Sequence, residues 1–223
     1  MHKTKLGAVL ASLAITVGTT AVLSAAPANA ATATTAKLDI SGHKNAKGAY
    51  GDYVGLFGGS VTDGSGNDVT SGAADLQRRL PGKGWKTISS DDSAGFLYFG
   101  TVDSHAHGNA QYRVHFLGDA TYAASYSNVV KVTTYWNLHE AGSCSGGCHF
   151  HGKLGPKARH HKVTIQVKHG SWKKYKVVKT NRKSKWNAKV TATRGKGTLY
   201  RAVVGGTKRI HKTTSAVWRF YKF

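Results

Sequence analysis

An internal repeat constrains the fold of this 223-residue chain more than any other feature of the sequence. Four blocks of the first half align with four blocks of the second half, and the offset stays between 88 and 90 residues. The aligned blocks are 74–79 with 163–168, 85–88 with 175–178, 95–98 with 185–188, and 112–118 with 200–206; Ser125 and Ser127 likewise align with Thr213 and Ser215. A nearly constant offset over four blocks predicts two copies of one structural unit.

The blocks alternate apolar and polar residues with a period of two, which is typical of half-buried β-strands. In the second half, Val163, Ile165 and Val167 alternate with polar neighbours, and residues 200–204 follow the same pattern. Glycine is frequent (27 residues), proline is rare (3), and no sustained helical period appears after residue 31. Short strands separated by glycine-rich turns, in units of this length, predict an all-β fold of two antiparallel sandwiches in tandem.

The first thirty residues resemble an export signal. Lys3 and Lys5 precede an apolar stretch at residues 6–23, and Ala28 and Ala30 occupy the small-residue positions of a cleavage site. We therefore expect cleavage before Ala31 and a protein that is secreted, extracellular or associated with the cell wall. A retained membrane anchor is the alternative, although glycine, serine and threonine dilute the apolar stretch. No later segment is apolar enough to span a bilayer.

The charge is unevenly divided along the chain. Residues 31–140 hold nine Lys/Arg and ten Asp/Glu, whereas residues 141–223 hold twenty-one Lys/Arg and no acid. Without acids, the second half cannot neutralise its cations internally, so it should attract polyanions. A surface that is merely well solvated is the alternative.

The cations of the second half fall mainly on the outward phase of the expected strands and in the turns. The candidate polyanion-binding residues are Lys168, Lys173, Lys174, Arg182, Lys183, Lys185, Lys189, Arg194, Lys196, Arg201, Lys208, Arg209 and Lys212. Aromatic residues lie among them and could stack on bases or on sugar rings. Trp186 and Tyr200 fit the inner rows and are expected in the core, whereas the roles of Trp172 and Trp218 stay open.

The only two cysteines, Cys144 and Cys148, lie close together near the middle of the chain. In an exported protein this pair predicts a disulfide. A metal site that uses both thiolates with His149 and His151 is the alternative, because four such ligands suit zinc or copper. The spacing matches no common zinc motif, and oxidation outside the cell competes for the thiols.

Two further clusters invite a functional interpretation. Residues 63–68 begin like a calcium loop, but position twelve is Ala74 and not glutamate, which favours a plain turn. Asp103, His105 and His107 invite acid–base or metal chemistry, although a solvated loop is the simpler interpretation. No recognised catalytic or phosphate-binding motif occurs, so we expect no enzyme and no cofactor.

Residues 37–135 resemble the bacterial immunoglobulin-like domains of secreted actinobacterial proteins. The resemblance rests on Tyr50-Gly51-Asp52, the segment 76–79 (LQRR), the lone Trp85, and the tail 112–127 with its Gly-Asp-x-x-Tyr element. Residues 150–220 are similar to a second, shorter member that lacks this element. The resemblance implies two immunoglobulin-like sandwiches: domain 1 at 31–138, a Cys/His linker at 139–152 and a short basic domain 2 at 153–223.

These observations predict a non-enzymatic secreted or cell-surface protein. Its second domain would bind an anionic cell-envelope polymer, such as teichoic acid or an acidic glycan. One alternative is a cationic antimicrobial effector or an effector that binds extracellular nucleic acid without sequence specificity. The other alternative is a metal-binding protein that uses residues 144–151.

Overall fold

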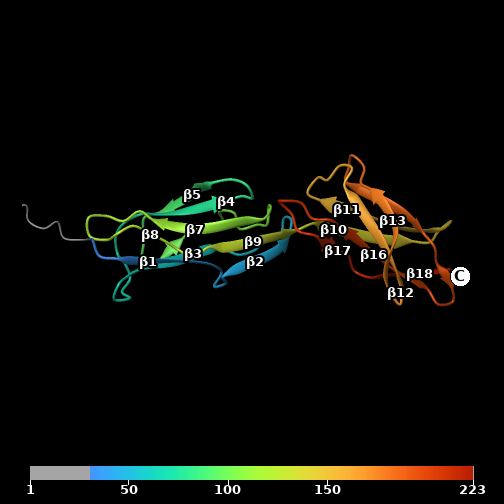
Figure 1. Ribbon diagram of the computed structural model, residues 1–223, viewed down its shortest axis with the longest axis horizontal. Coiled ribbons are helices and arrows are strands. Elements are labelled where there is room, and N and C mark those ends of the chain that lie inside the picture. Colours follow the sequence, from blue (N-terminus) through green and yellow to red (C-terminus); the bar gives the residue numbers. More distant parts are fainter. Residues whose placement is uncertain (1–30, 223) are drawn as a thin grey trace, which may run out of the picture. The chain divides into compact units, whose positions relative to one another are not determined.

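The computed structural model describes residues 31–222, and every regular element among them is a β-strand (Figure 1). The predicted export signal at residues 1–30 lies outside the described residues. The strands form four sheets, which are grouped as two sandwiches that follow each other along the chain. The all-β prediction is therefore confirmed. No helix within residues 31–222 has the length and apolar character needed to cross a membrane.

The first sandwich contains nine strands. These are β1 (Thr34–Ile40), β2 (Asn45–Ala49), β3 (Phe57–Asp63), β4 (Ala74–Arg79), β5 (Trp85–Asp91), β6 (Leu97–Tyr98), β7 (Ala110–Phe116), β8 (Ser125–Tyr126) and β9 (Val130–Tyr135). One sheet has the order β1-β3-β6 and the other has the order β2-β9-β7-β4-β5, with β8 paired to β7. All strand pairs are antiparallel except β2 with β9. The inward residues of both sheets form one core that includes Phe57, Leu76 and Phe116.

The second sandwich repeats this plan with its own core. Its strands are β10 (Asn137–Ser143), β11 (Cys148–Gly155), β12 (Lys162–His169), β13 (Ser171–Lys179), β14 (Lys185–Val190), β15 (Thr193–Arg194), β16 (Thr198–Val204), β17 (Thr213–Thr214) and β18 (Trp218–Lys222). The smaller sheet has the order β10-β11-β14, and the larger has the order β13-β12-β16-β18-β15, with β17 paired to β16. Trp186 and Tyr200 are buried in the core, as expected from the alternation.

The repeat is confirmed by matching irregularities as well as by strand order. Strand β4 shifts its register against β5 between Leu76 and Gln77, and β12 shifts against β13 between Ile165 and Gln166. A β-bulge at the same place in both copies indicates that the two copies adopt the same fold. The two serines of the alignment also match, because Ser127 Oγ accepts from Val114 N–H at 2.8 Å and Ser215 Oγ accepts from Ala202 N–H at 2.8 Å.

Two blocks of the sequence alignment need correction. Trp85 lies opposite Arg79 and Trp172 lies opposite Lys168, so the counterpart of Trp85 is Trp172 and not Tyr175. The turn between the paired strands is shorter in the second copy, which moves the register. The block at 95–98 is displaced by one residue, because the buried Leu97 corresponds to the buried Trp186.

Residues 139–152, expected to form a linker, lie within the second sandwich. Strands β10 and β11 pair antiparallel over Asn137–Gly155, and the segment between them is the turn of a hairpin. The core of the second sandwich already includes Trp136, whose indole N–H donates to the Gly205 carbonyl at 2.8 Å. The resemblance implied a linker here, but Gly146 and Gly147 lie in the turn of the hairpin and Gly152 lies where two strands pack closely.

In both copies a tyrosine, on β7 or on β16, is hydrogen-bonded back to a residue that precedes its strand. In the first, Tyr112 O–H donates to the Asp103 carboxylate at 3.2 Å; in the second, Tyr200 O–H donates to the Thr191 carbonyl at 2.8 Å. The bond from Tyr200 to a backbone carbonyl is that of a tyrosine corner, which together with two antiparallel sheets packed face to face is typical of immunoglobulin-like sandwiches. The chain therefore consists of two immunoglobulin-like sandwiches in tandem.

Candidate polyanion-binding surface

The cations of the second sandwich have almost no carboxylate available to them. The one acid in its strands is Glu140 on β10, whose carboxylate accepts from Ala216 N–H at 3.0 Å. Within residues 31–222 the ion pair that forms is Arg78 with Asp103, in the first sandwich. The lysines and arginines of the second sandwich therefore repel one another without internal compensation.

The smaller sheet directs two predicted cations outward. Lys185 and Lys189 alternate on β14 with the buried Trp186 and Ala188, so both ammonium groups lie on the outer face. Both residues are exposed. Strict alternation on a strand that covers the core explains why the sequence predicted this orientation.

The larger sheet directs a second group of cations to the opposite outer face. Lys168 lies on β12, Lys174 on β13 and Arg201 on β16. Arg201 differs from the two lysines, because its Nε donates to Gln166 Oε1 at 2.7 Å and its guanidinium lies 4.3 Å from the ring centroid of Trp172. Part of its hydrogen-bonding capacity is therefore already used within the sheet.

The remaining predicted cations lie at edges and in loops. Lys173 is on the edge strand β13, where closely spaced lysines hinder pairing with another sheet edge. The others are Arg182 and Lys183 between β13 and β14, Arg194 and Lys196 at and after β15, and Lys208, Arg209 and Lys212 between β16 and β17. The structure therefore places the predicted site residues on two outer faces and in several loops, and does not gather them into one patch.

The tryptophans of the second sandwich offer little open ring surface. Trp186 is 3% exposed, and Trp218 is only partly exposed and packs on the same core. Trp172, whose role the sequence left open, has Arg201 over its ring. Stacking of bases or sugar rings on these side chains, which the sequence suggested, would require them to move.

Sequence reasoning missed part of the outer face of the smaller sheet. His139, His149, His151 and Lys153 share this face with Lys185, because all lie on the outward phase of β10, β11 and β14. The signal was present in the sequence, since residues 148–154 alternate strictly. Which other strands contribute to the same face depends on the pairing of β11 with β10 and β14, which the local pattern does not show.

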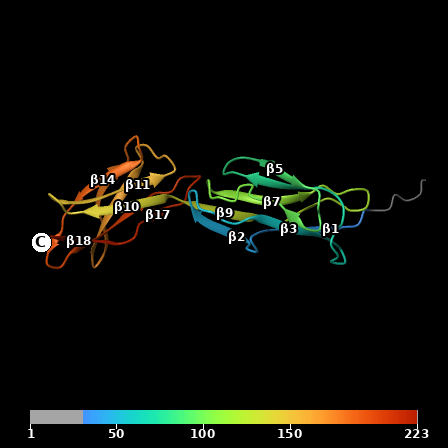
Figure 2. The ribbon, with the colours of Figure 1, turned by 180° about the vertical axis from the view of Figure 1, so that it is seen from behind.

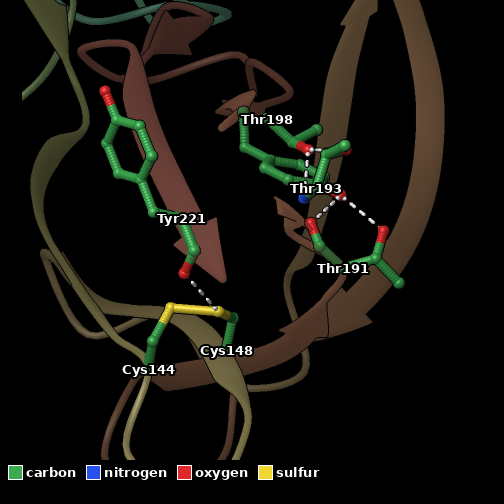
Figure 3. Close-up of a disulfide and its surroundings, with 7 residues drawn as sticks. Cys144, Cys148, Thr191, Thr193, Thr198 and Tyr221 are labelled. Carbon is green, nitrogen blue, oxygen red and sulfur yellow. Dashed lines mark hydrogen bonds between the residues drawn. A yellow bond between two sulfur atoms is a disulfide. The ribbon is translucent and has the colours of Figure 1, made fainter. Parts of the chain in front are cut away.

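The cysteines form a disulfide between Cys144 and Cys148, as predicted. Figure 3 shows the bridge at the turn of the β10–β11 hairpin, with Cys148 Sγ 3.7 Å from the Tyr221 carbonyl oxygen on β18. Both thiols are consumed by this bond, so they cannot serve as metal ligands. Among the described residues, no three His, Cys, Asp or Glu side chains are arranged to hold a metal ion.

The two other clusters noted in the sequence have structural partners. The Asp63 carboxylate accepts from the backbone and side chain of Asn67, and these hydrogen bonds lower the pKa of Asp63. This is the geometry of an Asx turn. Asp103 is paired with Arg78 and accepts from Tyr112, whose pKa is raised by burial first and by the Asp103 charge second. Asp103 is therefore engaged in structural contacts.

Comparisons with known proteins give no family for the chain. No protein-family model matches it, and no curated protein matches it. One similar solved structure is a tetra-tandem repeat from the extending region of a large adhesion protein, at 11% identity and a TM-score of 0.39. That match covers 85% of this chain and 49% of the other, so the chain spans about half the length of the repeat structure. A second is the ligand-binding domain of human OSCAR, at 9% identity, a TM-score of 0.32, and coverage of 83% and 98%.

Proposed function

We propose that this chain is a secreted or cell-surface, non-enzymatic binding protein whose second sandwich binds an anionic polymer. Cell-wall teichoic acid and acidic glycans are the polymers whose chemistry fits best. The observation that carries the proposal is the absence of carboxylate partners for the cations of residues 141–222. An uncompensated set of surface cations attracts polyanions over a long range and neutralises them on contact.

The distribution of the cations supports a polymer and not a small anion. Cations lie on both outer faces and in the loops of the second sandwich. A long flexible polyanion can contact such a distributed set at several points, and each contact releases counterions. The affinity should therefore come from many weak contacts.

The aromatic residues do not offer the open stacking faces that a single-stranded nucleic acid uses. Single-stranded nucleic acids bind by stacking bases on open aromatic faces. Trp186 is buried and the ring of Trp172 is covered by Arg201. The residues described here also form no amphipathic helix of the kind that membrane-disrupting peptides insert.

Co-sedimentation with purified anionic wall polymer tests the proposal through matched variants of the chain from Ala31 onward. Lys168→Gln, Lys174→Gln and Lys189→Gln together should reduce the bound fraction, because these exposed lysines of the second sandwich would contact the polymer. The control variant carries Lys37→Gln, Lys44→Gln and Lys47→Gln in the first sandwich and should bind like the parent. Equal losses in the two variants would contradict the proposal.

A further inference from the structure

The outer face of the β10-β11-β14 sheet is hollowed into a groove of about 860 Å³. Figure 2 shows the three strands of this sheet next to one another. Its side chains include three histidines and three lysines: His139, His149, His151, Lys153, Lys179 and Lys185. A groove lined with so many nitrogen donors is suited to ligands rich in acceptor oxygens.

The strand register places these nitrogen groups in rows across the sheet. His139, Lys153 and Lys185 are direct neighbours in one row. Two residues along, His151 lies opposite Asn187, and in the next row His149 lies opposite Lys189. Directly opposite side chains are about 5 Å apart at Cβ, and successive rows are about 7 Å apart. One ligand group can therefore contact a histidine and a lysine together.

The arrangement is repulsive when the groove is empty. Lys153 and Lys185 face each other directly, and like charges in that position destabilise a sheet. Glu140 is the only carboxylate beside the groove, and it accepts a hydrogen bond from the Ala216 backbone. An anion that enters the groove would relieve this repulsion.

The floor of the groove is closed from the core side of the sheet. Gly152 lies over Trp186, where an added Cβ would come within 2.9 Å of the indole ring. The indole is 3% exposed, and its Nε1 has no acceptor among the described residues. Because Trp186 alternates with the outward Lys185 and Asn187, its indole lies on the core side of the sheet, and the contacts to a ligand come from the outward side chains.

Three histidines line the groove beside its lysines. His149 Nδ1 lies 3.1 Å from the amide oxygen of Asn187, to which it donates a hydrogen bond. Imidazoles as a class gain a positive charge between about pH 8 and pH 5. Protonation would add up to three positive charges to those of the three lysines in the groove and of Lys189 at its edge.

We propose that this groove is an acid-enhanced binding site for the phosphate or sulfate esters of an anionic polymer. This inference rests on the proposed function and adds to it the location of the site and its regulation by pH. The lysines supply binding at neutral pH, and the histidines strengthen it as the surroundings become acidic.

Binding to dextran sulfate and to inorganic polyphosphate, measured at about pH 7.5 and about pH 5.5, tests the inference. The unaltered chain should bind about tenfold more tightly at the lower pH, because each added surface contact contributes modestly. His149→Gln with His151→Gln should reduce this gain to about twofold. The control is His169→Gln with His211→Gln, two exposed histidines outside the groove, which should keep the full gain.

The lysines are tested separately with Lys153→Gln and Lys185→Gln, which should weaken binding at both pH values. Circular dichroism of each variant checks that the sandwich is folded. The probe that responds identifies the ester, sulfate or phosphate, and a response to either supports the inference. Groove-dependent binding of single-stranded DNA without binding of either probe would overturn it.

The two proposals fail in different ways. If the unaltered chain binds neither probe at either pH, the proposed function is wrong and this inference falls with it. If binding depends on salt but ignores pH and the groove variants, the proposed function stands and the groove is not the site. Retention of the acid gain in the His149 and His151 variant would also overturn the inference.

Discussion

At the scale of single residues, both copies contain an arginine that is hydrogen-bonded to a glutamine and stacked on a tryptophan. Arg113 donates from Nε to Gln77 at 2.9 Å and lies 4.4 Å from the ring centroid of Trp85. In the second copy, Arg201 makes the same hydrogen bond to Gln166 and stacks on Trp172. The planar guanidinium fits a stack and a hydrogen bond at once, which a lysine ammonium cannot do. We therefore interpret Arg201 first as a structural residue.

Arg201→Lys separates this structural role from binding. The substitution keeps the positive charge but removes the stacking and the Nε–H donor. We expect the free energy of unfolding to fall by about 1 kcal/mol. Binding to anionic polymer should change by less than about twofold. Urea denaturation and a binding titration of the same sample check both values, and a large loss of binding with unchanged stability would contradict the assignment.

At the scale of elements, one glycine in each copy allows two strands of the smaller sheet to approach closely. A Cβ on Gly59 of β3 would clash with the Lys37 carbonyl on β1. A Cβ on Gly152 of β11 would clash with the His139 carbonyl on β10. The same constraint at equivalent places shows that the close approach belongs to the repeated unit.

Gly59→Ala should therefore destabilise the first sandwich by about 2 kcal/mol, because overpacking forces the two strands apart. Gly84→Ala is the matched control, since nothing lies within 4 Å of a Cβ added there. The control should stay within about 0.5 kcal/mol of the parent. Thermal unfolding of both variants measures the difference, and equal melting temperatures would show that the strands can separate at no cost.

The disulfide acts on one hairpin. The bond between Cys144 and Cys148 closes a short loop, so its loss should cost about 2 kcal/mol by the loop-entropy rule. Cys144→Ser with Cys148→Ser should lower the melting temperature and leave the fold intact. Circular dichroism before and after heating checks this expectation. Complete unfolding of the variant at room temperature would mean that the bridge supports the whole sandwich.

Sequence alternation predicted the strands well, because burial of one sheet face imposes a period of two. Val163, Ile165 and Val167 are all buried as expected. The alignment failed at Trp85, where a shorter turn changes the register without changing the strand pattern. Residues 139–152 form part of a hairpin and not a linker, because β11 also pairs with β14 of the second sandwich, a long-range contact that local sequence does not encode.

The site was harder to predict than the fold. The net charge of each half identified the basic sandwich, since the absence of Asp and Glu from residues 141–223 can be read from the sequence. It could not say that Lys168 and Lys185 lie on opposite faces, because that depends on which sheet each strand joins. The neighbourhood of His139, Lys153 and Lys185 likewise depends on cross-strand register, which local sequence does not encode.

At the scale of the whole molecule, the two sandwiches share a fold but differ in charge. Residues 31–140 are nearly neutral, whereas residues 141–223 carry twenty-one Lys/Arg and no acid. Because the core positions of the second copy remain apolar, its excess charge lies on its surface. The two copies therefore share a fold while only the second has a strongly cationic surface, and the central claim of the proposed function is that this surface binds an anionic polymer.

The dependence of polymer affinity on salt tests this claim most directly. The affinity of the chain from Ala31 onward for purified anionic wall polymer is measured between about 50 mM and about 200 mM salt, a range over which multiple phosphate contacts weaken steeply. A polymer that neutralises several cations should give a linear fall of log affinity with log salt and a loss of at least about a hundredfold. An affinity that stays constant over this range would contradict the account.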